Sequence, residues 1–145
     1  MNKIVYILLA IVSFCVVSCD KIPENGDLDG NWQLLTIEEH NSGEVVSVKE
    51  QKVFWAVQLK LIAYKGADNS YLSRFVYDGD SLFLYNFYRH TRYEDHLLTD
   101  SSTTELEKLG IHGISGRFAV ESLDKKRMVL NSNDSRLVNS DMYWK

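Results

Sequence analysis

The alternation of apolar and polar side chains is the feature that most restricts the fold of this chain. From Leu28 onward, apolar residues recur at every second position far more than at the 3.6-residue spacing of a helix. One parity of the run from residue 53 to residue 63 is apolar throughout: Val53, Trp55, Val57, Leu59, Leu61 and Ala63. Residues 114–122 alternate in the same way. Such runs predict strands with one face in the core and one in water, which is typical of antiparallel sheets.

Short turn signals separate the predicted strands at residues 41–43, 66–69, 78–79, 124–126 and 133–134. The sharpest is Asp78-Gly79, because both residues tolerate the positive backbone angles of a two-residue hairpin. In a hairpin through this turn, the odd-numbered positions before it share a face with Leu82 and Leu84. The opposite face is predicted to carry three outward aromatic residues, namely Phe83, Tyr85 and Phe87.

One short helix is predicted among these strands. The stretch from Ser102 to Glu105 has the pattern of a capping box, in which the two side chains satisfy the first turn of an α-helix. Gly110 supplies the left-handed residue that ends the helix, and Ile111 is expected to pack on Leu106. Many strands with one helix of about two turns favour a closed antiparallel barrel, because closure removes the aggregation-prone edges.

At this point the sequence resembles a known family. In the stretch 27–34, Gly30-Asn31-Trp32 is similar to the start of a lipocalin-like barrel, where the Trp plugs one end. Residues 105–111, 118–123 and 128–130 resemble the second half of the small lipocalin-like domains of bacterial envelope lipoproteins. The resemblance implies an all-β fold, an antiparallel lipocalin-like β-barrel of about eight strands with one short α-helix. It implies little about activity, because members of this group mostly lack a known function.

The first 18 residues are typical of a signal peptide. Lys3 precedes an apolar run, residues 4–17, that only Ser13 interrupts and that is too short to span a bilayer comfortably. Val16-Val17-Ser18-Cys19 resembles the lipobox of bacterial lipoproteins, which implies acylation of Cys19. The alternatives are a free thiol at Cys19 or an uncleaved membrane anchor.

The predicted organisation is therefore a lipoprotein signal peptide at 1–18, a polar tether at 19–27 and the barrel at 28–145. The predicted membrane contact is the N-terminal lipid, and the predicted location is the outer membrane, on either its periplasmic or its cell-surface face.

Charge and cysteine content exclude several functions. The chain has 16 Lys and Arg against 20 Asp and Glu, a formal net charge of -4, which argues against nucleic acid as a partner. Cys15 lies in the signal peptide and Cys19 is predicted to be acylated, so the mature chain has no thiol for disulfides, metal binding or nucleophilic catalysis.

The remaining polar residues do not form a recognisable catalytic or metal pattern. His90 and His96 share strand parity, but their spacing matches no standard metal site. The adjacent acids Glu38 and Glu39 point to opposite faces of a strand, so they are unable to flank one glycosidic bond. The prediction is a protein that is not an enzyme and has no metal and no cofactor.

Inward aromatic and aliphatic residues are the candidates for ligand binding: Trp55, Val57, Leu59, Tyr71, Phe75, Tyr77, Phe118 and Val120. They predict a non-enzymatic binding module for a small apolar or amphipathic molecule, since ligand sites are mostly apolar cavities with a few polar groups. The alternative is an accessory or structural subunit that docks onto another envelope protein through the outward aromatics. Interior volume distinguishes the two, because a barrel of eight strands either fills with side chains or holds one small ligand.

Overall fold

The computed structural model of the chain describes residues 2–6, 23–66 and 68–142. Residues 2–6 are helical. Cys19 and most of the predicted signal peptide lie outside the described residues. Within these residues, no helix is both long enough and apolar enough to span a membrane.

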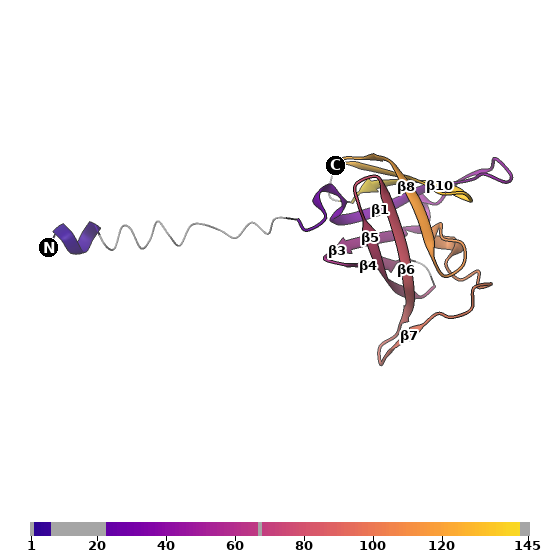
Figure 1. The fold of residues 1–145 in the computed structure, drawn as a ribbon, viewed down its shortest axis with the longest axis horizontal. Coiled ribbons are helices and arrows are strands. Elements are labelled where there is room, and N and C mark those ends of the chain that lie inside the picture. Colours follow the sequence, from indigo (N-terminus) through magenta and orange to yellow (C-terminus); the bar gives the residue numbers. More distant parts are fainter. Residues whose placement is uncertain (1, 7–22, 67, 143–145) are drawn as a thin grey trace.

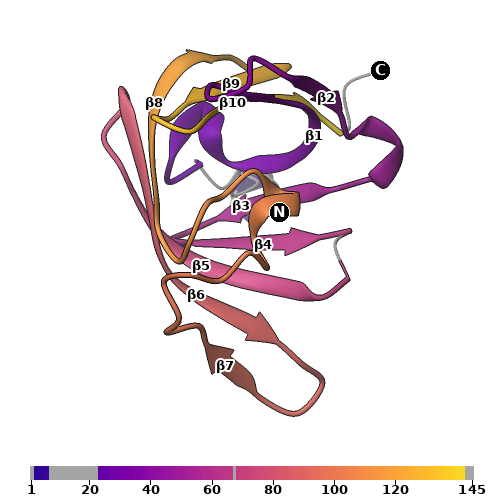
Figure 2. The same ribbon diagram turned by 90° about the vertical axis from the view of Figure 1, so that its right-hand side faces the viewer.

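The described part of the chain forms ten strands in one antiparallel sheet: β1 (Gly30–Glu39), β2 (Val45–Ser47), β3 (Phe54–Gln58), β4 (Leu61–Lys65), β5 (Ser70–Tyr77), β6 (Ser81–His90), β7 (Asp95–Leu97), β8 (Gly116–Leu123), β9 (Arg127–Asn131) and β10 (Ser135–Asp141). Eight of these ten close into a ring in the order β1-β3-β4-β5-β6-β8-β9-β10, where β10 pairs with β1 (Figures 1 and 2). β2 adds to β1, and β7 adds to β6. The predicted all-β barrel is confirmed.

The two ends of the barrel are closed by different segments. At the tether end, where β1 begins, the 3-10 helix η1 (Gly26–Leu28) lies next to Trp32, and the Trp32 Nε1–H donates to the Leu28 carbonyl over 2.9 Å. At the far end, the loop that carries the 3-10 helix η3 (Glu107–Leu109) lies across the opening (Figure 2). This loop buries Leu106, Leu109 and Ile111 completely. A third 3-10 helix, η2 (Lys49–Gln51), precedes β3.

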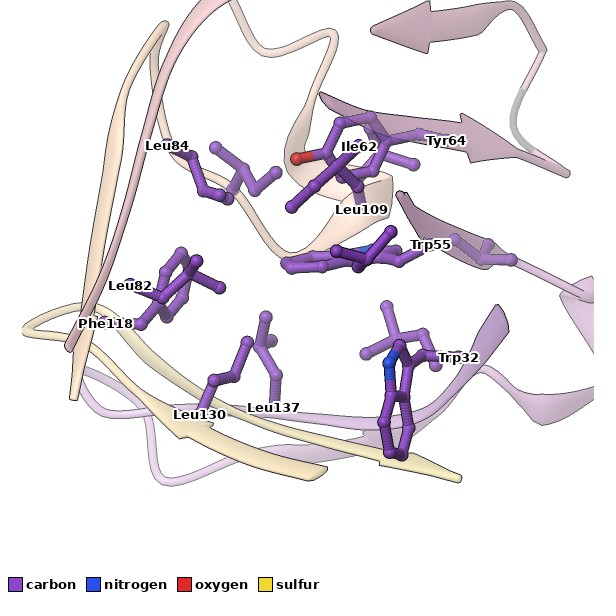
Figure 3. Close-up of a cluster of buried hydrophobic side chains, with 14 of the residues drawn as sticks. Trp32, Trp55, Ile62, Tyr64, Leu82, Leu84, Leu109, Phe118, Leu130 and Leu137 are labelled. Carbon is purple, nitrogen blue, oxygen red and sulfur yellow. The ribbon is translucent and has the colours of Figure 1, made fainter. Parts of the chain in front are cut away.

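Aromatic side chains fill the centre of the barrel. Trp55 meets Tyr64 edge-on, with ring centroids 5.2 Å apart, and Phe118 from the opposite wall at 6.3 Å (Figure 3). Phe87 packs on Tyr64 at 5.7 Å. The Tyr64 hydroxyl, which burial would otherwise leave unsatisfied, hydrogen-bonds Ser73 over 2.8 Å. These rings are at most 2% exposed, so side chains occupy the middle of the barrel.

Two local irregularities change the predicted sides of several residues. The run 53–63 is broken by a turn at Leu59, whose φ is 55°, so Leu59 is 60% exposed and Ile62 and Tyr64 face inward in its place. In β6, a bulge at Asn86, with φ of 51°, turns Phe87 into the core. One extra residue reverses the alternation beyond it. The predictions of an inward Leu59 and an outward Phe87 were therefore wrong.

The predicted helix is shorter than expected. It is the three-residue η3, and it ends as predicted at Gly110, whose φ is 81° and whose N–H bonds the Glu107 carbonyl. The Ile111 N–H returns to the Leu106 carbonyl over 3.2 Å. The capping box does not form, because Ser102 bonds Asp100 and the Glu105 carboxylate turns to the barrel wall.

Candidate functional site

A groove of about 630 Å³ lies at the tether end, between the segment 23–31 and β3. Its volume falls in the range of ~300–1,000 Å³ typical of small-molecule sites. Nine residues line it: Pro23, Glu24, Asp29, Gly30, Asn31, Ala56, Val57, Gln58 and Leu59. We refer to it as the tether groove.

The wall of the tether groove is held by Asn25. Its side-chain amide donates over 2.6 Å to the Leu59 carbonyl and over 2.6 Å to the Asp29 carboxylate. These bonds fix the chain before β1 against the β3–β4 turn. The groove is therefore shaped by the barrel and by the predicted tether together.

The lining chemistry of the tether groove is apolar with an acidic component. Pro23, Ala56, Val57 and Leu59 supply apolar surface, and the charged lining residues, Glu24 and Asp29, are both acidic. Because like charges repel, a carboxylate or phosphate ligand is disfavoured. The groove suits a molecule with an apolar body and a hydroxyl, amide or ammonium group.

The eight predicted ligand residues do not come together around one open space. Five of them are buried in the core: Trp55, Val57, Tyr71, Phe75 and Phe118. Tyr77 and Val120 are partly buried and pack against that core. Of the eight, Val57 and Leu59 line the tether groove. A binding role for the set stays a prediction.

A polar cluster at the far end was missed by the sequence analysis. The Arg89 Nε–H donates to Glu105 Oε2 over 3.1 Å, a second guanidinium nitrogen donates to Oε1, and the Tyr71 hydroxyl donates to Oε2 over 3.0 Å. The hydrogen bonds from Arg89 hold the pKa of Glu105 below its usual range, and burial raises the pKa of Tyr71. We call these three residues the far-end clasp. Tyr71, Arg89 and Glu105 are distant in the sequence, so no local pattern reveals the far-end clasp.

The histidines of the β6–β7 hairpin pair with acids. His90 Nδ1 lies 2.6 Å from Asp95 Oδ1, and His96 Nε2 lies 3.3 Å from Glu94 Oε1. Among the described residues, no group of three potential metal ligands is found.

A ring of eight antiparallel strands, closed at one end by a buried Trp near the start of the first strand, defines a lipocalin-like barrel. The chain belongs to the lipocalin-like domain family, whose model matches residues 13–140.

Two solved structures share the fold. A lipocalin-like protein from Bacteroides uniformis ATCC 8492 is 18% identical, with a TM-score of 0.58 over 81% of this chain and 100% of its own. An uncharacterized protein from Bacteroides eggerthii DSM 20697 is 17% identical, with a TM-score of 0.52 over 78% of this chain and 98% of its own. Comparison with curated proteins finds no match.

Proposed function

We propose that this protein is a lipid-anchored, non-enzymatic binding module of the outer membrane, and that it holds a small apolar or amphipathic molecule in the tether groove. The observation that carries the proposal is the groove itself, whose volume and apolar lining suit such a ligand. The family supports it at a coarser level, because lipocalin-like barrels often bind small hydrophobic molecules.

The groove is a better site than the barrel interior. Trp55, Tyr64, Phe87 and Phe118 occupy the centre at 0–2% exposure, and a ligand there would have to displace them. The interior of an eight-stranded barrel is only just wide enough for either side chains or one small ligand. Binding on the outside leaves this core intact.

The proposed anchor places the groove near the membrane. Pro23 is four residues after Cys19, a separation that spans at most ~14 Å even when the chain is fully extended. A lipid on Cys19 would therefore hold the groove close to the bilayer surface, where amphipathic molecules concentrate. The same argument applies on the periplasmic and the cell-surface face.

Acylation is tested separately from ligand binding. Growth with a fatty-acid probe is expected to label the wild-type protein and not Cys19→Ala. Equal labelling of both proteins would contradict the anchor and leave the groove proposal to its own test.

The ligand is tested by native mass spectrometry of the protein purified from its own host. We expect an adduct on the wild type that is lost in Ala56→Trp, because the indole would fill the groove. Ala119→Trp is the matched control, since Ala119 is also an outward strand residue but lies on β8, away from the groove. An adduct that survives Ala56→Trp, or no adduct on the wild type, would overturn the proposal.

A further inference from the structure

The outer side of the barrel carries an apolar face that contains two arginines and no acid. Cross-strand partners point to the same side of a sheet, so the register places three adjacent rows of outward residues from β4 to β8 next to one another. The rows are Ala63-Leu72-Tyr88-Leu97, Leu61-Arg74-Tyr85 and Val76-Phe83-Arg117. We call these ten residues the aromatic face; β4, β5 and β6, which carry most of it, lie side by side in Figure 1. The next outward row, Ser70-His90-Asp95, borders the aromatic face and carries an acid that pairs with His90.

The centre of this face is ordered by ring contacts. Phe83 and Tyr85 stack, with ring centroids 5.6 Å apart and planes 14° apart. The Arg117 guanidinium lies 4.8 Å from the Phe83 centroid, within the range of a cation–π contact. The position of these side chains is therefore set before any partner arrives, which lowers the entropy lost on binding.

The composition of the aromatic face is that of a protein interface. Leu61, Val76 and Leu97 are 45%, 56% and 48% exposed, so the face presents aliphatic surface to solvent. Interface cores are enriched in aromatic residues and Arg and depleted in Lys, Asp and Glu, and all three of these depleted types are absent from the ten positions.

Charge indicates the chemistry of the partner. Within the described residues, the side chains of Arg74 and Arg117 form no ion pair or hydrogen bond, and the Arg117 guanidinium lies over the Phe83 ring. The chain as a whole carries a net charge of -4, so this face is locally opposite in sign to the rest of the protein. Carboxylates on a partner would pair with both guanidinium groups, which no acid among the described residues pairs.

A second copy of the chain fits this face less well. Symmetric dimers use the same patch on both subunits. Such a dimer would enclose the arginines of both patches in one interface with no acid among the patch residues, and uncompensated like charges oppose association. The geometry points to a different protein. We infer that the aromatic face docks an envelope protein that presents carboxylates to Arg74 and Arg117 and apolar groups to Val76, Phe83 and Tyr85.

The experiment uses the full-length protein in its own host. A photo-crosslinking phenylalanine replaces Tyr85 on β6, or, as a control, Val138, which is outward on β10, three strands further around the ring. We expect a crosslink at position 85 and not at 138, to a protein whose crosslinked peptide is rich in Asp and Glu. Crosslinks to lipid, to a second copy or to a peptide without acids would overturn the inference, as would equal yields at the two positions.

The arginines are then tested in the same assay. The double variant Arg74→Glu, Arg117→Glu is expected to lower the crosslink yield at least about tenfold, whereas Arg74→Lys, Arg117→Lys keeps most of it. An unchanged yield after charge reversal would contradict the role of the arginines. If the Glu variant melts at a lower temperature than the wild type, its loss of crosslinking no longer tests the charges alone. The test is then the salt dependence of binding between the wild-type protein and the purified partner. Binding that does not weaken as NaCl rises would overturn the inference.

Discussion

Arg89 on β6 and Glu105 before η3 form a two-point ion pair that fastens the far-end loop to the barrel wall. The loop inserts Leu106, Leu109 and Ile111 into the core, and all three are fully buried. Lys108, on the same loop, forms a second ion pair with Asp68 in the β4–β5 turn. The burial of these apolar side chains stabilises the loop. The ion pair between Arg89 and Glu105 holds the loop against β6.

Glu105→Gln is expected to lower the free energy of unfolding by roughly 1 kcal/mol at neutral pH, the upper range for a partly exposed pair. The pKa of Glu105 is lower in the folded protein than in the unfolded chain, so its contribution is fully present above about pH 5. It is lost as the pH falls through the folded pKa. Urea titrations at several pH values should show the two proteins converging below pH ~4.

Glu107→Gln is the matched control for this pH effect. Its side chain is exposed on η3 and makes no hydrogen bond or ion pair within the described residues. A gap between Glu105→Gln and wild type that stays constant down to pH 2 would contradict the assignment to the carboxylate.

Trp32→Ala is expected to cost ~3–5 kcal/mol of unfolding free energy, as large aromatic truncations in cores do. Trp32 is 1% exposed and bonds the Leu28 carbonyl, so the variant loses both a packed indole and the contact that holds η1. Tyr93→Ala, at an 89% exposed position, should change the free energy of unfolding by less than ~0.5 kcal/mol. Guanidinium denaturation measures the free energy of unfolding of both variants. A loss below ~1 kcal/mol for Trp32→Ala would place the ring outside the core.

Gly66→Ala and Gly43→Ala separate backbone strain from steric conflict. Both glycines have positive φ, 93° and 66°, so alanine is strained at either position. A Cβ at Gly66 would lie 1.9 Å from the Lys52 carbonyl oxygen, whereas one at Gly43 meets nothing within 4 Å. We expect a cost of about 1 kcal/mol at Gly43 and of at least ~3 kcal/mol at Gly66, measured by thermal denaturation. Equal losses of unfolding free energy in the two variants would show that the β4–β5 turn shifts to accommodate the methyl group at position 66.

Asn139→Leu is expected to raise the free energy of unfolding by about 1 kcal/mol. Asn139 is 0% exposed on β10, and neither its amide nitrogen nor its amide oxygen bonds another described residue. An apolar side chain of similar size removes that desolvation cost. Asn139→Asp, which adds a buried charge, should lower stability strongly. Destabilisation by Leu in urea titrations would mean that the amide has a hydrogen-bond partner in solution.

The strands, the closed barrel and the placement of Trp32 at one end of it were predicted from the sequence alone. These features depend on local alternation and on a motif within a few residues. Gly110 was recognised as the end of a helix for the same reason, since only a residue tolerant of positive φ fits there. The outward positions of Phe83 and Tyr85 followed from the alternation as well.

Tertiary structure decided the rest. The turn at Leu59 and the bulge at Asn86 are single-residue events that reverse which side chains enter the core, and no periodicity marks them. The far-end clasp and the tether groove join segments far apart in the chain, such as Tyr71 with Glu105 and Pro23 with Val57. A sequence pattern reports the face of each strand, but the contacts that make a site arise only when barrel closure brings separate strands and loops together.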